Sequence, residues 1–238
     1  MNKLSELSIF FPFWNEEDNI DIVISKAIGV VTNITQNWEI LMIDDGSSDK
    51  TLEKMKLLSK TDKRLITISH KPNRGYGAAL RSGFENAKYK YIVFNDGDGQ
   101  FDFSEISKFI EKIENSDIVI GYRKKRLDHP FRHILMNLLK IWDYVLFGFR
   151  FNDIDCGFKL FKKEAVEKIL PLKSEGAMIT TEILAKAKKA HLKIAQVEVH
   201  HYPRIYGDQS GGNLRVILRA IKESLLLWKE LNFNYGRN

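Results

Sequence analysis

The chain has 238 residues, 44% of them hydrophobic, which is enough to close one sizeable core, and one domain is expected. Its 37 Lys and Arg residues exceed its 31 Asp and Glu residues, and the net charge of +6 favours anionic partners such as phosphates, nucleic acids or acidic lipid surfaces without choosing among them. The single cysteine, Cys156, excludes an intrachain disulfide and favours a reducing compartment such as the cytoplasm.

Short apolar runs rich in β-branched and aromatic residues alternate with helix-period segments along the first half of the chain. This alternation is typical of βαβ units that build a mostly parallel sheet. The apolar stretch at 9–14 is too short for a signal peptide. Strands are expected at 7–13, 38–43, 65–69, 91–95 and 117–121. Helices are expected between them, at 20–31, 50–60, 76–88 and 103–115.

The alternation loosens after about residue 122. The elements expected there are an apolar helix near 132–147, a strand near 157–161, helices near 163–170 and 179–190, a strand near 193–199, a Gly-rich loop and a terminal helix. The most apolar window, 134–149, is interrupted by Lys140 and Asp143, and no uncharged run reaches the roughly 20 residues of a membrane span. Without repeats or linkers, we expect one α/β domain at 1–212, followed by an amphipathic helix at 213–238.

Polar side chains directly follow three of the expected strands. In an open α/β sheet, ligands bind outside the carboxyl ends of the strands, so these side chains should converge on one crevice. They come after the first, second and fourth strands and are Asn15, Glu16 and Glu17, then Asp44 and Asp45, then Asp96, Asp98 and Gln100.

The tripeptide Asp96-Gly97-Asp98 places two carboxylates two positions apart with glycine between them. Both side chains can face the same way, which suits Mg²⁺ or Mn²⁺ completed by water and a diphosphate. The alternative is an acidic turn that only caps the helix at 103–115.

Two further loops are candidates for nucleotide binding. Asp44 and Asp45 can accept hydrogen bonds from a nucleobase and ribose, or serve only in a turn, while a residue at 47–49 caps the next helix. Arg74 and Gly75 belong to a small, positively charged loop that leads into a helix N-terminus, a natural place for phosphate.

The order and spacing of several motifs over residues 7–212 resemble the inverting glycosyltransferases of family two. Within it, Asp153-Ile154-Asp155-Cys156-Gly157-Phe158-Lys159 is most similar to the dolichyl-phosphate mannose synthase and polyprenyl-phosphate glycosyltransferase branch. The other motifs that carry the resemblance are Phe11-Pro12-Phe13-Trp14-Asn15-Glu16-Glu17, Asp44-Asp45-Gly46-Ser47-Ser48-Asp49, Asn73-Arg74-Gly75, Asp96-Gly97-Asp98-Gly99-Gln100 and Gly121-Tyr122-Arg123.

The resemblance implies a GT-A-type nucleotide-diphospho-sugar transferase fold and a GDP- or UDP-sugar donor. It places four residues in the nucleoside pocket, with tryptophan where the family usually has tyrosine: Pro12, Trp14, Glu16 and Asp45. It assigns Asp96, Asp98 and Gln100 to the metal and diphosphate. Arg123 resembles an arginine near the phosphates, or else belongs to a solvated basic run at 123–126.

The resemblance also implies catalytic groups in the second half of the chain. Arg204 lies in a segment similar to the family's mobile loop, although Gly211 stands where a lysine is usual. A guanidinium there can bind phosphate oxygens in pairs. Asp153 and Asp155 are the candidates for a general base, with Glu182 a weaker one, and the alternative role of the two aspartates is to position Lys159 or a loop.

The acceptor remains open between two classes. A polyprenyl phosphate is already ionised at neutral pH and needs little help from a base, whereas a saccharide hydroxyl must lose its proton to a carboxylate. A third reading is a non-catalytic nucleotide-sugar or nucleic-acid binding module. Nucleic acid is disfavoured because acidic side chains cluster where the ligand would enter.

Two segments, 129–151 and 214–233, mix aromatic and aliphatic residues with basic ones. Such composition fits helices that lie in a lipid interface, and ordinary core packing is the alternative. Together with the positive charge, it leads us to expect a cytoplasmic protein in peripheral contact with a membrane. The sequence predicts no particular oligomeric state.

Overall fold

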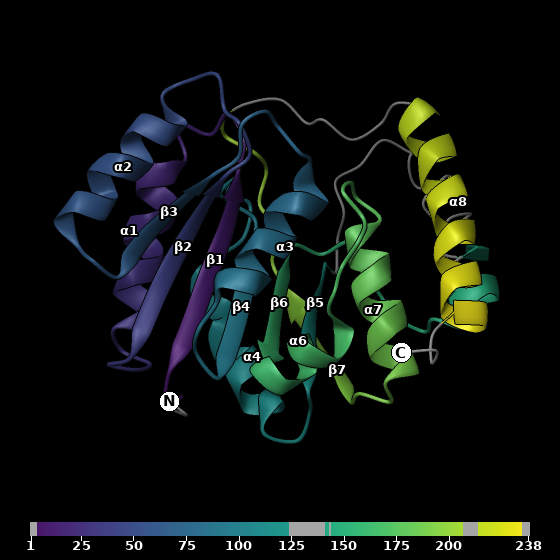
Figure 1. Cartoon of the computed structure of the whole chain (residues 1–238). Helices are drawn as coiled ribbons and strands as arrows, with labels where there is room; N and C mark the ends of the chain where they lie inside the picture. Colours follow the sequence, from purple (N-terminus) through teal and green to yellow (C-terminus); the bar gives the residue numbers. More distant parts are fainter. Residues whose placement is uncertain (1–3, 124–140, 143, 207–213, 235–238) are drawn as a thin grey trace.

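A seven-stranded sheet in the order β3-β2-β1-β4-β6-β5-β7 runs through the centre of the protein (Figure 1). The computed structural model describes residues 4–123, 141–142, 144–206 and 214–234. Every predicted strand is present, with its ends within two residues of the prediction. The strands are β1 (Leu7–Phe13), β2 (Trp38–Asp44), β3 (Leu65–Ser69), β4 (Tyr91–Asn95), β5 (Ile118–Arg123), β6 (Phe158–Lys162) and β7 (Ile194–Val199).

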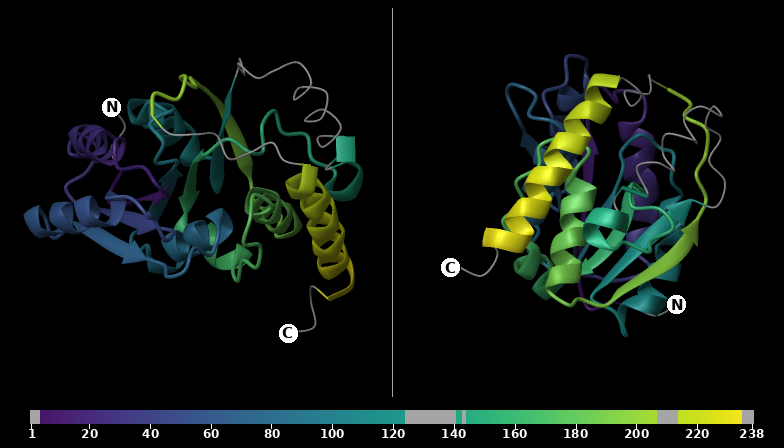
Figure 2. Two further views of the ribbon diagram at one scale, coloured as in Figure 1. Left: turned by 90° about the horizontal axis from the view of Figure 1, so that it is seen from above. Right: turned by 90° about the vertical axis from the view of Figure 1, so that its right-hand side faces the viewer.

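Helices cover both faces of this sheet, as expected for a doubly wound α/β fold (Figures 1 and 2). One face packs against α1 (Ile20–Val31), α2 (Thr51–Thr61) and α4 (Ile106–Ile113), the last preceded by a short 3-10 helix, η1 (Phe103–Glu105). The other face packs against α3 (Tyr76–Asn86), α6 (Lys163–Ile169) and α7 (Ile179–Lys189). The helix predicted at 103–115 is therefore two elements, and Asp102 caps the first through the backbone N–H of Ser104.

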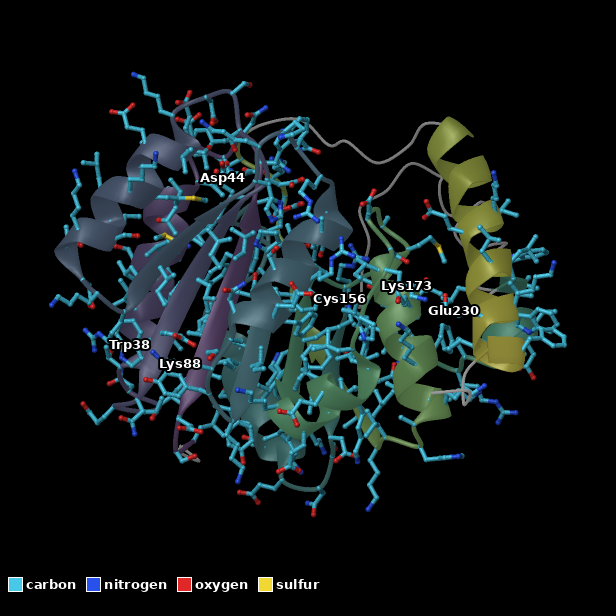
Figure 3. All side chains as sticks on the ribbon, viewed as in Figure 1. Trp38, Asp44, Lys88, Cys156, Lys173 and Glu230 are labelled. Atoms are coloured by element: carbon cyan, nitrogen blue, oxygen red, sulfur yellow. The ribbon has the colours of Figure 1, made fainter. Side chains whose placement is uncertain are left out.

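The sheet is mostly parallel, as predicted, with one exception. Strand β6 runs antiparallel to both of its neighbours, β4 and β5. Strand β1 is buried on both faces, which explains why every residue in it except Ser8 is apolar. The parallel strands β1, β2 and β4 end at the same edge of the sheet, and Figure 3 labels Asp44 at that edge of β2 and Trp38 at the other.

The C-terminal helix α8 (Leu214–Lys229) and the following π-helix η2 (Glu230–Asn234) lie beside α7 at one end of the sheet (Figures 1 and 2). Leu227 and Leu231 are buried in the core cluster on that side. Trp142 donates a hydrogen bond from Nε1 to Ser224 Oγ at 2.8 Å, which joins α8 to the helical residues at 141–142 and 144–147.

Parts of two predictions lie outside the described residues. The predicted helix at 132–147 is described only at 141–142 and 144–147, where it is helical. The Gly-rich loop around Gly207, Ser210, Gly211 and Gly212 and the basic positions 124–126 are not described. Among the helices that are described, none is long and apolar enough to cross a membrane.

Candidate active site

A cavity of about 670 Å³ opens at the carboxyl edge of β1, β2 and β4. Parallel strands bring their following loops to one edge of a sheet, so segments distant in the sequence meet there. The cavity is lined by Pro12, Phe13, Trp14, Asn15, Glu16, Asp45, Asn73, Gly75, Tyr76, Ala79, Asp96, Gly97, Asp98 and Arg204.

Two carboxylates, those of Asp96 and Asp98, face this cavity. The Tyr76 hydroxyl donates a hydrogen bond to Asp96 Oδ1 at 2.8 Å. Burial and the nearby negative charge of Asp98 raise the pKa of Asp96 to about 7. Asp102, and not Asp98, caps the following helix. The capping alternative therefore does not account for the paired carboxylates.

These two carboxylates fit a hard divalent cation. Within the described part of the chain, no group of three or more His, Cys, Asp and Glu side chains is arranged to hold a metal. Mg²⁺ and related ions, however, are commonly held by one or two carboxylates, with water and substrate phosphates as the other ligands. A cation between Asp96 and Asp98 would also relieve the charge repulsion that raises the pKa of Asp96.

Gln100, the third predicted metal ligand, lies in a different position. Its side chain is buried and does not line the cavity. Its amide nitrogen donates to the carbonyl oxygen of Tyr202 at 3.0 Å, and the Tyr202 N–H donates back to the Gln100 carbonyl at 2.8 Å. Gln100 thus ties the loop after β4 to the segment that carries Arg204.

Arg204 closes one side of the cavity. Its Nη2 atom forms an ion pair with Glu16 Oε1, and Nη1 lies 3.8 Å from Asp98 Oδ2. Glu16 also accepts a hydrogen bond from Asn19 Nδ2 at 2.6 Å. Burial raises the pKa of Glu16 despite these two donors. The loop after β7 and the loop after β1 therefore meet beside the carboxylate of Asp98.

The two adjacent aspartates after β2 have different environments. Asp45 lines the cavity, and its carboxylate accepts the backbone N–H groups of Arg74 at 3.0 Å and Gly75 at 2.8 Å. Asp44 is fully buried and accepts from Ser47 N at 3.0 Å and Ser69 Oγ at 2.9 Å. Asp44 therefore stabilises the turn and does not line the cavity, because its oxygens bond Ser47 in the turn and Ser69 at the end of β3.

The loop before α3 lines the cavity with the backbone of Gly75 and not with the charged side chain of Arg74. Gly75 lines the cavity and has φ +95°, a conformation that a side chain would strain. Arg74 is not among the lining residues. Pro12 and Trp14 also line the cavity, and half of the Trp14 surface is exposed (50%).

Arg123 and Asp153 lie outside the cavity and bind each other. Arg123 Nε lies 2.6 Å from Asp153 Oδ2, and Nη2 lies 3.0 Å from Oδ1. Such a two-point contact fixes both side chains. Asp155 is exposed, and its backbone N–H donates to Asp153 Oδ1 at 3.2 Å. Glu182, the weaker base candidate, is buried and paired with Lys186 at 2.7 Å.

Residues 8–170 match the sequence profile of the family described as Glycosyl transferase family 2. The chain belongs to this family. This confirms the resemblance drawn from the motifs.

The dolichyl-phosphate beta-glucosyltransferase of Saccharomyces cerevisiae is similar to this glycosyltransferase, with 31% identity over 242 residues. That match covers 91% of this chain and 71% of the yeast protein. The undecaprenyl-phosphate 4-deoxy-4-formamido-L-arabinose transferase of Salmonella choleraesuis is 27% identical over 216 residues. That match covers 90% of this chain and 65% of the bacterial protein.

Solved structures support the GT-A-like fold of this glycosyltransferase. The glucosyl-3-phosphoglycerate synthase of Mycobacterium tuberculosis, in complex with Mn²⁺, UDP and glucosyl-3-phosphoglycerate, aligns with a TM-score of 0.69 at 16% identity over 95% of this chain and 80% of that one. A mannosyltransferase of Pyrobaculum calidifontis, in complex with GDP-mannose and Mn²⁺, aligns with a TM-score of 0.64 at 13% identity over 98% and 65% of the two chains.

Sequence reasoning placed Asn15 in the crevice but missed the roles of Tyr76 and Asn73. Tyr76 binds Asp96, Asn73 donates from Nδ2 to the Asp45 carbonyl at 2.7 Å, and Asn15 accepts the Ser48 N–H at 2.8 Å. Asn15 has φ +55°, which asparagine tolerates better than most residues. An asparagine directly after a strand was the available signal for it. The sequence around Tyr76 does not indicate that its hydroxyl binds Asp96, because Asp96 belongs to another loop.

Proposed function

We propose that this chain is an inverting, divalent-metal-dependent glycosyltransferase that moves a sugar from a nucleotide-diphosphate sugar to a polyprenyl phosphate. The observation that carries this proposal is the pair of carboxylates, Asp96 and Asp98, facing one cavity beside the guanidinium of Arg204. A diphosphate needs both a cation and a phosphate-binding donor, and this cavity offers groups for each.

The donor would lie along the cavity from the β1 side. Trp14 and Pro12 provide apolar surface for a nucleoside of GDP or UDP, and Asp45 shapes the floor through its bonds to the loop before α3. Asp96 and Asp98 would hold Mg²⁺ or Mn²⁺ against the diphosphate. The bound ion would supply Lewis-acid stabilisation of the charge that develops on the leaving group.

Arg204 would supply the second half of that stabilisation. Its guanidinium bonds Glu16 and lies 3.8 Å from Asp98, which would place it beside a phosphate held at Asp96 and Asp98. A donor fixed in advance costs no reorganisation during the reaction. Glu16 would keep the guanidinium in place during transfer. The acceptor would attack the sugar on the face opposite the leaving diphosphate, which inverts the anomeric carbon.

Two observations support a phosphate acceptor. The relatives from yeast and Salmonella are named for dolichyl phosphate and undecaprenyl phosphate. In addition, two of the three candidate bases have other partners, since Asp153 binds Arg123 and Glu182 binds Lys186. An ionised phosphate oxygen attacks without losing a proton, so the engagement of these two carboxylates would not hinder transfer to it.

A lipid acceptor also calls for contact with a membrane surface, and we place that contact on the C-terminal helices. The division into a catalytic domain at 1–212 and an interfacial helix at 213–238 belongs to the same proposal. Large apolar side chains are exposed on the 141–147 segment, on α8 and on η2, namely Ile141, Tyr144, Val145, Leu225, Leu226 and Phe233. We refer to these six residues as the apolar face. Peripheral binding on the cytoplasmic side would bring the lipid phosphate to the cavity.

The experiment incubates the purified chain with labelled GDP- and UDP-sugars, Mn²⁺ or Mg²⁺ and a short-chain polyprenyl phosphate, followed by extraction into organic solvent. We expect one donor to give a labelled lipid, and no product with chelator or with Asp98→Ala, a variant that keeps the wild-type circular dichroism spectrum. Transfer only to saccharide hydroxyls would contradict the proposed acceptor, and full turnover with chelator would contradict the metal.

A further inference from the structure

Outside the cavity, α7 carries a buried ion pair. Lys186 Nζ lies 2.7 Å from Glu182 Oε1, and the two residues are only 3% and 1% exposed. Burying both charges is costly unless further hydrogen bonds satisfy them. Here those bonds go to one loop, that between α6 and α7. Glu182 accepts the backbone N–H groups of Lys173 at 2.9 Å and Ser174 at 2.7 Å, and Lys186 bonds the carbonyl oxygen of Pro171.

This loop packs directly against the turn that begins α3. The Gly77 N–H donates to the Glu175 carbonyl oxygen at 2.8 Å. A Cβ atom added at Gly77 would collide with the Ser174 carbonyl oxygen, and one added at Gly75 would collide with the Glu175 carbonyl oxygen. The two backbones therefore touch without intervening side chains, and a shift of one displaces the other.

Tyr76 stands between those two glycines, and its hydroxyl binds Asp96 Oδ1 at 2.8 Å. We propose that Glu182, neutralised by Lys186, is a positioning residue for the metal site: it fixes the 171–175 loop, the loop fixes the turn at 75–77, and the turn holds Tyr76 on Asp96. The inference rests on the proposed function, because it assumes that Asp96 binds the metal.

The charge state of Glu182 agrees with this role. Burial acts to raise its pKa, but hydrogen bonds from Lys186 and Ser174 outweigh burial and hold the pKa below its usual value. The side chain is therefore an ionised acceptor at neutral pH, which binds backbone N–H groups more strongly than a neutral amide does. Its near-complete burial also keeps it from serving as the general base.

The test measures Mn²⁺ binding by electron paramagnetic resonance of the free ion, with metal alone and no substrate. Groups that orient metal ligands typically change affinity 10- to 100-fold when they are altered. We expect Glu182→Gln and Tyr76→Phe each to raise the Mn²⁺ dissociation constant roughly tenfold. Because both act through one path, the Glu182→Gln and Tyr76→Phe double variant should bind no more weakly than Tyr76→Phe alone.

Glu230→Gln is the matched control. Glu230 binds the same loop through Lys173 Nζ at 2.7 Å, but on its exposed side toward α8, and Figure 3 labels this pair. This variant should keep the wild-type Mn²⁺ affinity, because the loop's buried anchor remains. A tenfold loss in Glu230→Gln equal to that in Glu182→Gln would show that any disturbance of the loop suffices, and would overturn the specific role of Glu182.

The remaining outcomes are also decisive. A folded Glu182→Gln variant with wild-type Mn²⁺ affinity overturns the inference, and so does an additive loss in the double variant. If Glu182→Gln does not fold, Gly77→Ala disturbs the same contact from the turn side, and unchanged affinity in that variant overturns it as well. If the wild-type chain itself binds no Mn²⁺, the proposed metal dependence fails, and the inference fails with it. If the wild-type chain binds Mn²⁺ and Glu182→Gln binds it equally well, only the inference fails.

Discussion

Arg204 and Glu16 are separated by 188 positions in the chain, yet their side chains form an ion pair in the wall of the cavity that Asp96 and Asp98 also line. The same guanidinium lies 3.8 Å from Asp98 Oδ2. The pair joins the loop after the last strand to the loop after the first strand. In the proposed mechanism, this pair holds Arg204 beside the departing diphosphate.

Replacing Arg204 should therefore slow sugar transfer. Removing one preorganised donor to a developing negative charge typically costs about 10²- to 10³-fold in kcat. We expect Arg204→Ala to show a loss of that size in steady-state assays, and Arg204→Lys a smaller one, because lysine keeps the charge but loses the two-point geometry. An unchanged kcat for Arg204→Ala would exclude this role.

Mn²⁺ binding should depend on pH through Asp96. The pKa of this carboxyl is raised by burial and by Asp98 to about 7, so in the metal-free protein it holds its proton at mildly acidic pH. A protonated carboxyl does not bind the ion. The apparent Mn²⁺ affinity should rise as pH increases toward 7 and level off above it. Titration calorimetry from pH 5.5 to 8.5 measures this, and a flat profile would contradict it.

The same pKa determines the sign of a stability effect in the metal-free protein. The folded-state pKa of Asp96 lies above the value of 3.8 for an unperturbed Asp, so the folded state holds the extra proton between pH 3.8 and about 7. The contribution of this group to the free energy of unfolding therefore falls as pH rises through that window. Urea denaturation of wild type and Asp96→Asn should differ in this slope, and identical slopes would refute the assignment.

Breaking the Arg123 and Asp153 pair should destabilise the fold. Both side chains are largely buried, and removing one partner of such a pair costs about 3 to 5 kcal/mol because the other charge stays buried. We expect Asp153→Ala to lower the free energy of unfolding by about that amount in urea titrations. The exposed pair of Arg64 and Asp62, at 2.7 Å, is the control, and Asp62→Ala should cost at most about 1 kcal/mol. Equal effects would contradict the prediction.

The apolar face should bind lipid surfaces. Val145 is 70% exposed and Leu226 is 57% exposed. We expect the Val145→Asp and Leu226→Asp double variant to lose most of its co-sedimentation with phosphatidylglycerol vesicles, because charges in the interface are costly. Leu57→Asp is the control, since Leu57 is 54% exposed on α2, at the other end of the sheet (Figure 1). Equal binding by all three proteins would rule out this face.

Much of the site was predictable from the sequence because parallel strands end at one edge. Asp45 and Asp96 follow apolar strands, and the alternation of strands and helices indicated that those strands share a sheet. The structure confirms that both side chains line one cavity. The pairing of Asp44 with Ser69 was not predictable, because it depends on how β3 lies beside β2 and not on local spacing.

The second half was harder to predict for a physical reason. Strand β6 is inserted antiparallel between β4 and β5, and hydrophobic periodicity carries no information on strand order or direction. That insertion brings Asp153 to the end of β5, where it binds Arg123. The sequence motifs therefore marked both residues as functional but did not reveal that they bind each other.

The most direct test of the account is a crystal structure of the chain with Mn²⁺ and a nucleoside diphosphate. The account predicts an anomalous peak for manganese bound by the carboxylates of Asp96 and Asp98 and by the diphosphate, with Arg204 on a phosphate oxygen. Manganese bound elsewhere, or a diphosphate that avoids this cavity, would contradict the central claim.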